Sequence, residues 1–249
     1  MNEAVFISDL HLHPNEPEIT QRFVDFITWA KQNTQALYIL GDFFHVWVGD
    51  DLIADFEISI AKQLLELHAL NIPVYFMPGN RDFLLGDKFL KLAKMHLLPD
   101  PCVLSLKGIR IFLTHGDAYC LHDKAHQFLR RLTRPTLLKS IFLAFPKTIR
   151  ASIVHRVRNL SRDKKINTNS HHQKYQVVKE KLFQDMQKHQ VNHVIYGHVH
   201  HPQHNQHLWK NRHINEFILS DWEQNPHFVY YNVNKGLILS LFFNGDVNN

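Results

Sequence analysis

Five short segments of this sequence place histidine, aspartate or asparagine directly after an apolar run. The segments are Asp9-Leu10-His11, Gly41-Asp42, Gly79-Asn80-Arg81-Asp82, His115-Gly116-Asp117 and Gly197-His198-Val199-His200. Each apolar run has the length and composition of a buried β-strand, and the neighbouring glycines allow the chain to turn sharply. Because open α/β sheets carry their sites at the carboxyl ends of the strands, we expect the five segments to meet in space.

These segments contain seven candidate metal ligands, namely Asp9, His11, Asp42, Asn80, His115, His198 and His200. Oxygen and imidazole donors without cysteine favour Mn²⁺, Fe²⁺ or Zn²⁺ over a thiolate-bound metal. Residues i and i+2 of an extended chain lie on the same side, so each Asp-x-His or His-x-His pair can face one ion. Seven ligands are too many for one ion that keeps an open position, but they suit two ions about 3.5–4 Å apart that share a carboxylate. Such a pair binds phosphate and activates water, so the pattern predicts a hydrolytic site.

The competing interpretation is that the histidines are ordinary polar residues. The chain has 20 His, and a single Asp-x-His or His-x-His pair is often incidental. Because five segments agree, we interpret them as a metal site. Other histidines we interpret as surface or hydrogen-bonded residues: His13, His45, His68, His171, His172, His201, His204 and His207. Among these, His45 and His201 adjoin motif residues.

The elements that must position these segments alternate along the chain. Apolar runs predict strands at 5–8, 36–40, 74–77, 109–113 and 193–196, and later at 217–219, 228–231 and 237–243. Apolar residues at helical spacing predict helices at 17–33, 56–67 and 175–186. Alternating strands and helices indicate an α/β sheet, and the strand-rich end of the chain indicates a second sheet.

The charge of the chain is concentrated in one segment. With 45% hydrophobic and 20% charged residues in 249, the chain is globular and not disordered. Residues 124–165 hold 12 of the 28 Lys and Arg with one acid, Asp163, so this segment carries +11 and the rest, with 16 basic and 22 acidic residues, carries −6. Basic and apolar residues at helical spacing predict an interfacial helix or a lid that binds an amphiphile; the alternative is a basic outer face on ordinary core helices. No motif of a nucleic-acid-binding fold accompanies the charge, so we expect no nucleic-acid partner.

The cysteines and the N-terminus bear on the compartment. Cys102 and Cys120 form no CxxC pair, which predicts no disulfide framework and a reducing environment. The N-terminus lacks the pattern of a signal peptide, and no run of 18 apolar residues occurs. We therefore expect a cytoplasmic protein, and we expect it to be a monomer.

The five segments also resemble the motifs of calcineurin-like metallophosphoesterases. The resemblance is closer to one branch, the UDP-2,3-diacylglucosamine hydrolases of lipid A synthesis, at three further stretches and over nearly the whole chain. These stretches are Trp47-Val48-Gly49-Asp50-Asp51, the sequence GNRDFLLG at 79–86, and Leu219-Ser220-Asp221-Trp222. The resemblance implies an α/β fold of the αββα sandwich type, with two mixed sheets flanked by helices. It implies one domain over residues 1–249, with a helical lid insertion at about 122–168.

The resemblance also implies roles for individual residues. Asp9, His11, Asp42 and His200 would hold one Mn²⁺, and Asp42, Asn80, His115 and His198 the other, with Fe²⁺ or Zn²⁺ as alternatives. The implied reaction is hydrolysis at the α-phosphorus of UDP-2,3-diacylglucosamine, giving UMP and 2,3-diacylglucosamine 1-phosphate. Asn80, Arg81 and His115 are the expected catalytic residues. The expected substrate contacts are Asn80, Arg81, Asp123, Ser161, Lys165 and His198.

The implied substrate leads to expectations about location. The basic, apolar lid would hold the acyl chains and contact an anionic membrane, with the protein peripheral on the cytoplasmic face of the inner membrane. Three positions depart from the family pattern: Val199 and His201 stand where threonine and arginine are usual, and Thr168 where lysine is common. The alternatives are a phosphodiesterase or phosphatase of the same fold acting on another nucleotide or phosphodiester, and a non-catalytic scaffold, which should have lost ligands.

Overall fold

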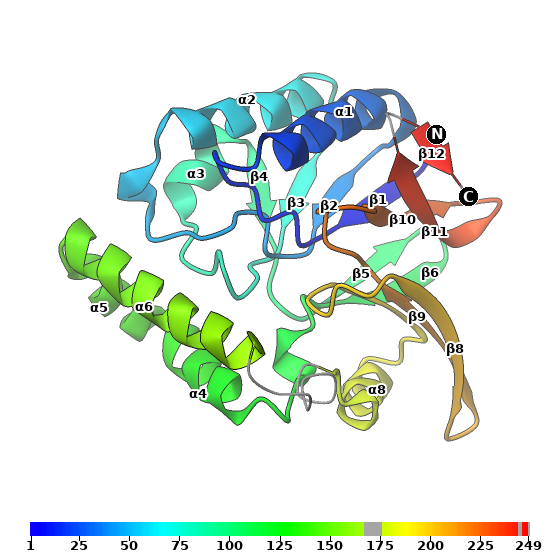
Figure 1. The fold of residues 1–249 in the computed structure, drawn as a ribbon. Coiled ribbons are helices and arrows are strands. Elements are labelled where there is room, and N and C mark those ends of the chain that lie inside the picture. The colour runs from blue at the N-terminus through cyan, green and yellow to red at the C-terminus, as the bar shows by residue number, and fades with distance from the viewer. Residues whose placement is uncertain (167–175, 244–245, 249) are drawn as a thin grey trace.

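The protein is described from a computed structural model that covers residues 1–166, 176–243 and 246–248, with residues 158–166, 243, 246 and 248 described by their backbone alone. Two mixed β-sheets face one another, as Figure 1 shows. The first sheet has the order β12-β11-β10-β1-β2-β3-β4 and the second β5-β6-β7-β9-β8. The predicted fold class, two mixed sheets with flanking helices, is confirmed.

The strands of the first sheet are β1 (Ala4–Ile7), β2 (Leu37–Ile39), β3 (Val74–Phe76), β4 (Met95–Leu97), β10 (His227–Asn232), β11 (Gly236–Phe243) and β12 (Asp246–Asn248). Those of the second are β5 (Cys102–Leu106), β6 (Ile109–Leu113), β7 (His193–Tyr196), β8 (Gln203–Trp209) and β9 (Arg212–Ile218). β1 to β4 run parallel, and β6, β7 and β9 run parallel. The carboxyl ends of neighbouring parallel strands therefore share one edge in each sheet.

Alternating side chains of the first strand separate two layers of core. Val5 and Ile7 pack under the helices α1 (Pro17–Asn33), α2 (Asp55–Ala69) and α3 (Asp87–Leu92), which cover the outer face of the first sheet in Figure 1. Ala4 and Phe6 point the other way, into the core between the two sheets. Successive side chains of a strand point to opposite faces, so a strand that is covered on both sides is apolar throughout. A third core lies between the second sheet and α8 (Lys179–Lys188).

Most predicted elements are present, and the departures have local causes. The helix expected from residue 175 begins at Lys179 with Val178 as its cap residue, and Tyr175 lies outside the described residues. The strand expected at 217–219 begins earlier, at Arg212, because it forms a hairpin with β8. Sequence reasoning missed β8 itself, because its residues are mostly Gln, His and Asn and its position at a sheet edge needs no apolar alternation.

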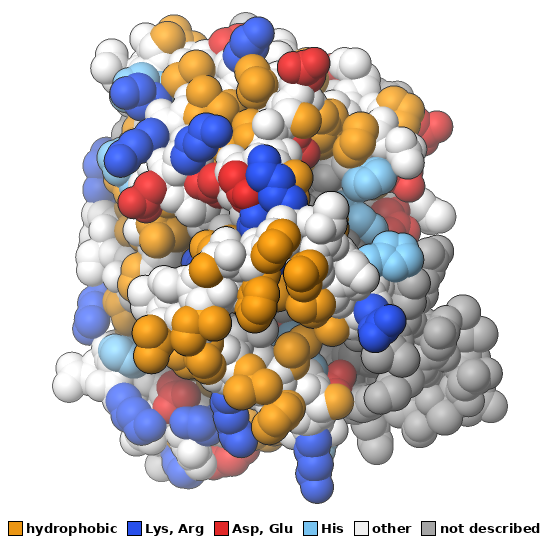
Figure 2. All heavy atoms as spheres, turned by 90° about the vertical axis from the view of Figure 1, so that its left-hand side faces the viewer, with side chains coloured by type: hydrophobic (Ala, Val, Ile, Leu, Met, Phe, Trp, Pro, Cys, Tyr) orange, Lys and Arg blue, Asp and Glu red, His pale blue; other side chains and the backbone are white. Residues whose placement is uncertain are grey.

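The helices α4 (Lys124–Thr133), α5 (Thr136–Ala144) and α6 (Lys147–Ile166) project from the side of the sandwich in Figure 1. They cover most of the predicted insertion; residues 167 and 168 lie outside the described residues. Figure 2 shows apolar side chains gathered on the face that these helices form, with Lys and Arg beside them. The exposed apolar residues of this insertion, together called the lid face below after its expected role, are Phe128, Leu129, Leu132, Leu137, Leu138, Ile141, Leu143, Phe145, Ile149 and Ile153. In the part of the chain that the structure describes, no helix has both the length and the apolar character needed to cross a membrane.

Candidate metal centre

The candidate ligands lie where strands of the two sheets end. Asp9 follows β1, Asp42 follows β2 and Asn80 follows β3, and the registers Ile7↔Ile39 and Ile39↔Phe76 align these three strand ends. His115 and His198 follow β6 and β7 of the facing sheet, which pair in parallel through Leu113↔Ile195. The site therefore lies where the carboxyl ends of parallel strands from both sheets come together.

Six of the seven expected ligands contact one another through their donor atoms. Asp42 lies between two histidines: its Oδ2 is 3.5 Å from His11 Nε2 and its Oδ1 is 3.6 Å from His115 Nε2. His115 Nε2 is 3.1 Å from Asn80 Oδ1. On the other side of the site, His200 Nε2 is 3.3 Å from Asp9 Oδ1.

These contacts form two adjoining groups of potential ligands. Asp9, His11 and His200 have donor atoms within 4.8 Å of one another, and so do Asp9, Asp42 and His115. Asp9 belongs to both groups, whereas the expected shared ligand is Asp42, which contacts a histidine on each side. Either carboxylate has the two oxygen atoms that a shared ligand needs.

Two buried atoms test whether the donor set suits a cation. Asp9 Oδ1 and His11 Nε2 are buried and make no hydrogen bond within the described structure. A buried polar atom without a partner is costly, and such atoms are rare in native proteins. A divalent cation would satisfy both, and carboxylate with imidazole is a donor mixture that such cations accept. The residues therefore fit a metal ion.

Hydrogen bonds orient the side chains so that their potential metal-binding atoms face the centre. Ser8 Oγ donates to Asp9 Oδ2 at 2.6 Å and the His198 backbone N–H donates to the same oxygen at 2.8 Å, which leaves Oδ1 for an ion. His115 Nδ1 is 2.9 Å from the Leu40 carbonyl. Because a carbonyl only accepts, Nδ1 carries the proton and Nε2 faces Asp42 and Asn80.

His198 is placed differently from the other six. Its imidazole lies against the ring of His115, with 5.1 Å between ring centroids, and 5.7 Å from the ring of His126. It belongs to neither group of potential ligands within 4.8 Å. Burial and the charge of His115 lower the pKa of His198 to about 3, so its ring is neutral.

The charges of the centre favour ionised carboxylates. Burial alone would raise the pKa of Asp42, but His115, His11 and Arg81 hold it well below its ordinary range. For His115, burial opposes the charged form, but Asp42 and Asp9 raise its pKa to about 9. An imidazole must lose its proton to bind a metal, so metal binding releases protons at this site.

The backbone at the centre is held in an unusual conformation. Asp9, His11, Asp42, His198 and His200 all have φ between 52° and 67°. Non-glycine residues in the left-handed region cost of order 1–3 kcal/mol each, and such residues cluster at functional sites. The close packing also requires glycine: a Cβ on Gly197 would lie 2.1 Å from Asp9 Oδ2.

Arg81 extends the centre toward solvent. Its Nε is 3.3 Å from Asp42 Oδ2, and its Nη1 is 3.4 Å from His45 Nδ1. Since guanidinium can only donate, this His45 nitrogen accepts. Asp82, the residue after Arg81, is buried and accepts a hydrogen bond from the backbone N–H of Gly79. Burial and the nearby Asp42 charge raise the pKa of Asp82 to about 7.

The expected substrate contacts outside the metal centre lie on α6 and at the start of α4. Asp123 is buried and caps α4, with its Oδ1 accepting from the His126 backbone N–H at 3.1 Å. Ser161 and Lys165 belong to the last turns of α6, where the structure describes only the backbone, and Thr168 lies outside the described residues.

Two residues near the ligands escaped sequence reasoning. Asp221 Oδ2 is 3.1 Å from His200 Nδ1. The sequence could have indicated Asp221, because this residue follows the strand predicted at 217–219 just as the other candidates follow predicted strands. His126, on α4, has Nε2 3.2 Å from Asp117 Oδ2 and its ring beside His198; its position on a helix gave no comparable signal.

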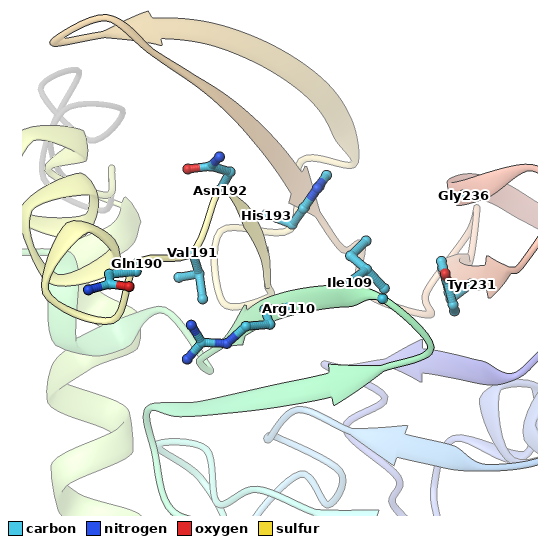
Figure 3. A pocket seen from close by; sticks show the side chains of 9 residues that line it. Ile109, Arg110, Gln190, Val191, Asn192, His193, Tyr231 and Gly236 are labelled. Carbon is cyan, nitrogen blue, oxygen red and sulfur yellow. The ribbon is translucent and has the colours of Figure 1, made fainter.

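A cavity of about 340 Å³ lies at the other end of the second sheet. Figure 3 shows Ile109 and His193 among its lining residues, and these begin β6 and β7. His115 and His198 follow the last residues of the same strands. Within the described residues, both groups of potential metal ligands lie at the metal centre and neither lies at this cavity.

Comparison with known proteins identifies one family and several relatives that carry the same name. Residues 4–202 match the family described as Calcineurin-like phosphoesterase. A UDP-2,3-diacylglucosamine hydrolase of Psychromonas ingrahamii is 37% identical over 228 residues, covering 91% of this chain and 92% of the relative. The protein of the same name from Shigella dysenteriae is 38% identical over 199 residues, covering 80% and 82%, and that of Aeromonas hydrophila is 36% identical over 219 residues, covering 88% and 90%.

Proposed function

Because this chain belongs to the calcineurin-like phosphoesterase family, we propose that it hydrolyses UDP-2,3-diacylglucosamine at the α-phosphorus, releasing UMP and 2,3-diacylglucosamine 1-phosphate in lipid A synthesis. Its relatives, which match most of their own length, carry the name of that hydrolase. The reaction is the cleavage of a phosphoric anhydride by water. The enzyme is a metal-dependent hydrolase.

One observation carries the proposal: two groups of potential ligands adjoin at the strand ends, and two of their atoms, Asp9 Oδ1 and His11 Nε2, are buried without a hydrogen bond in the described structure. A pair of divalent cations supplies Lewis acidity, which polarises a phosphate and makes water acidic enough to react near neutral pH. Asp9, His11, Asp42 and His200 would hold one cation. Asp42, Asn80, His115 and His198 would hold the other.

The cofactor is a divalent metal, and we propose that it is Mn²⁺. Oxygen and imidazole donors without thiolate support Mn²⁺, with Fe²⁺ and Zn²⁺ as the competing ions in a titration. The buried carboxylates of Asp9 and Asp42 stay ionised, which favours cation binding electrostatically. Their fixed orientation, set by Ser8 and by the Arg81 backbone N–H, means that the site needs little rearrangement to bind an ion.

Arg81, Asn80 and His115 would act on the substrate phosphate. Arg81 is partly exposed at the mouth of the centre, and its planar guanidinium can donate two parallel hydrogen bonds to phosphate oxygens. Its Nε contact with Asp42 fixes its position beside the proposed ligands. Asn80 and His115 would act by holding a cation, which would supply Lewis acidity.

The lid supports a lipid substrate. It carries exposed apolar side chains, with Leu137 at 72% and Phe128 at 64% of full exposure. We propose that residues 1–249 form one domain and that the insertion at about 122–168 holds the acyl chains. Asp123, Ser161, Lys165 and His198 are proposed contacts to the rest of the substrate.

The same face supports a peripheral membrane location. Each Lys or Arg near an anionic headgroup contributes about 1 kcal/mol, and the segment 124–165 contains 12 such residues. We propose that the monomer meets the cytoplasmic face of the inner membrane through this face, with no nucleic-acid partner.

The decisive experiment is an assay of UMP release from UDP-2,3-diacylglucosamine by metal-free protein to which Mn²⁺, Fe²⁺ or Zn²⁺ is added back. We expect metal-dependent UMP release at a rate that is highest with Mn²⁺. If the Mn²⁺-loaded protein leaves this lipid intact but cleaves simple phosphodiesters, the chain is a phosphodiesterase with another substrate.

A further inference from the structure

We propose that Asp221 is a positioning residue that orients His200 toward the metal centre. This inference rests on the proposed role of His200 as a ligand, and it adds a residue outside the ligand set. Asp221 follows β9, which pairs in parallel with β7 through Tyr196↔Ile218. The ends of the two strands are therefore neighbours, and the loop after β9 reaches the loop that carries His200.

The geometry places Asp221 behind the histidine. His200 Nε2 faces Asp9 Oδ1 at 3.3 Å, while His200 Nδ1 faces Asp221 Oδ2 at 3.1 Å. The two nitrogens of an imidazole point away from one another, so the Asp221 carboxylate lies across the ring from Asp9. Asp221 is therefore placed to act through His200 and not as a ligand itself.

The chemistry of this arrangement is specific. A carboxylate only accepts hydrogen bonds, so it requires the proton of neutral His200 to be on Nδ1. This leaves the lone pair of Nε2 directed toward Asp9, which is the tautomer that a metal needs. Such a carboxylate behind a ligand histidine fixes the ring and increases its basicity, and its loss typically weakens metal binding 10–100-fold.

The loop around Asp221 is held by other contacts. Trp222 is fully buried in the core, and its carbonyl accepts from Arg22 Nη1 at 2.8 Å. The Ser220 hydroxyl donates to the Asn225 carbonyl at 3.1 Å, which closes the loop. Asp221 Oδ1 also accepts from the Glu223 backbone N–H at 3.4 Å, a contact that Asp221→Asn can keep and Asp221→Ala removes. The contacts of Trp222 and Ser220 do not involve the Asp221 carboxylate, so they remain when it is removed.

The test measures Mn²⁺ binding to the full-length, metal-free chain by calorimetry, together with the thermal midpoint of the same metal-free samples. We expect Asp221→Ala to weaken the binding of one ion 10–100-fold. Asp221→Asn should weaken it less, since its amide oxygen still accepts from Nδ1. The matched control is Glu223→Gln, which removes an exposed carboxylate from the same loop and should leave the affinity within twofold.

A double-mutant cycle separates positioning from a general effect on the loop. In a His200→Ala background, Asp221→Ala should cause no further loss, because a residue that acts through His200 has nothing left to orient. An equal loss in both backgrounds, wild-type affinity in Asp221→Ala, or an equal loss in Glu223→Gln would overturn the proposal. If His200→Ala itself binds both ions normally, the assignment of His200 as a ligand fails first, which is a different result.

Discussion

Arg150, on helix α6 of the lid, buries its guanidinium against the loop after β2 and pairs with the carboxylate of Asp51. Its Nη1 donates to the Val48 carbonyl and its Nε to the Phe145 carbonyl at 2.9 Å. The stretch from Trp47 to Asp51, which the sequence shares with the hydrolase branch, thus joins the lid to the body of the protein. The structure gives this stretch an anchoring role.

Replacing Arg150 should therefore loosen the lid. Hydrogen bonds to charged groups contribute about 1.5–3 kcal/mol each, so we expect Arg150→Met to lower the free energy of unfolding by about 2–4 kcal/mol. It should also speed proteolysis within 124–166. Denaturant unfolding and limited proteolysis measure these effects. Arg156→Gln, an exposed change on the same helix, should alter neither, and equal behaviour of the two variants would contradict the anchor.

Loss of a proposed metal ligand should stop the reaction without unfolding the protein. His11→Ala removes an atom placed between Asp42 and Asp9, and Asn80→Ala removes the oxygen beside His115. We expect each to reduce kcat at least 100-fold with little change in the circular dichroism spectrum. His68→Ala, an exposed position on α2, is the control. Turnover near wild type in both ligand variants would refute the site.

Low pH should lower the free energy of unfolding, partly because Glu216 becomes protonated. This buried carboxylate accepts from His207 Nε2 and Asn205 Nδ2, both at 2.9 Å, and from Lys179 Nζ at 3.1 Å. Burial would raise the pKa of Glu216, but these partners hold it below the ordinary value of 4.5. Because the folded-state pKa is lowered, the stabilisation is present above about pH 4.5 and is lost as the pH falls through the folded value.

Glu216→Gln tests this linkage. We expect the variant to be less stable than wild type at pH 7 by about 2 kcal/mol, with the difference shrinking below pH 4.5 as the wild-type carboxylate takes up its proton. Urea unfolding between pH 7 and pH 3 measures the difference. Glu16→Gln, a change at an exposed glutamate, should alter the free energy of unfolding by less than about 0.5 kcal/mol. If the difference in unfolding free energy between wild type and Glu216→Gln stayed constant with pH, the linkage would be disproved.

The lid face should decide binding to membranes. Burying a leucine side chain contributes roughly 1.5–3 kcal/mol, so Leu137→Asp should reduce binding to vesicles that contain anionic lipid by roughly tenfold or more. Leu208→Asp is a matched control, because Leu208 is 70% exposed on β8 of the second sheet. Vesicle sedimentation at two salt concentrations separates apolar from electrostatic attraction. A comparable loss in both variants would show that the lid face is not the contact.

The sequence by itself determined the strand ends and the residues that the structure brings together there. Asp9, His11 and His200 could be recognised because residue type, i+2 spacing and a preceding apolar run are local properties of the chain. Such local signals also predicted the helix from Pro17 and the strands that precede each segment. They left open what the basic segment 124–165 does.

Only the tertiary structure decided which groups face one another across the site. Asp221 and His200 meet because β9 pairs with β7 in one register, and Arg150, one of many basic residues in its segment, is buried because the lid folds onto Asp51. The ring of His198 lies beside that of His115 because β6 and β7, which precede these residues, pair in parallel. Strand partners and helix docking depend on packing between distant segments, and local periodicity shows which face of an element is apolar but not which neighbour covers it.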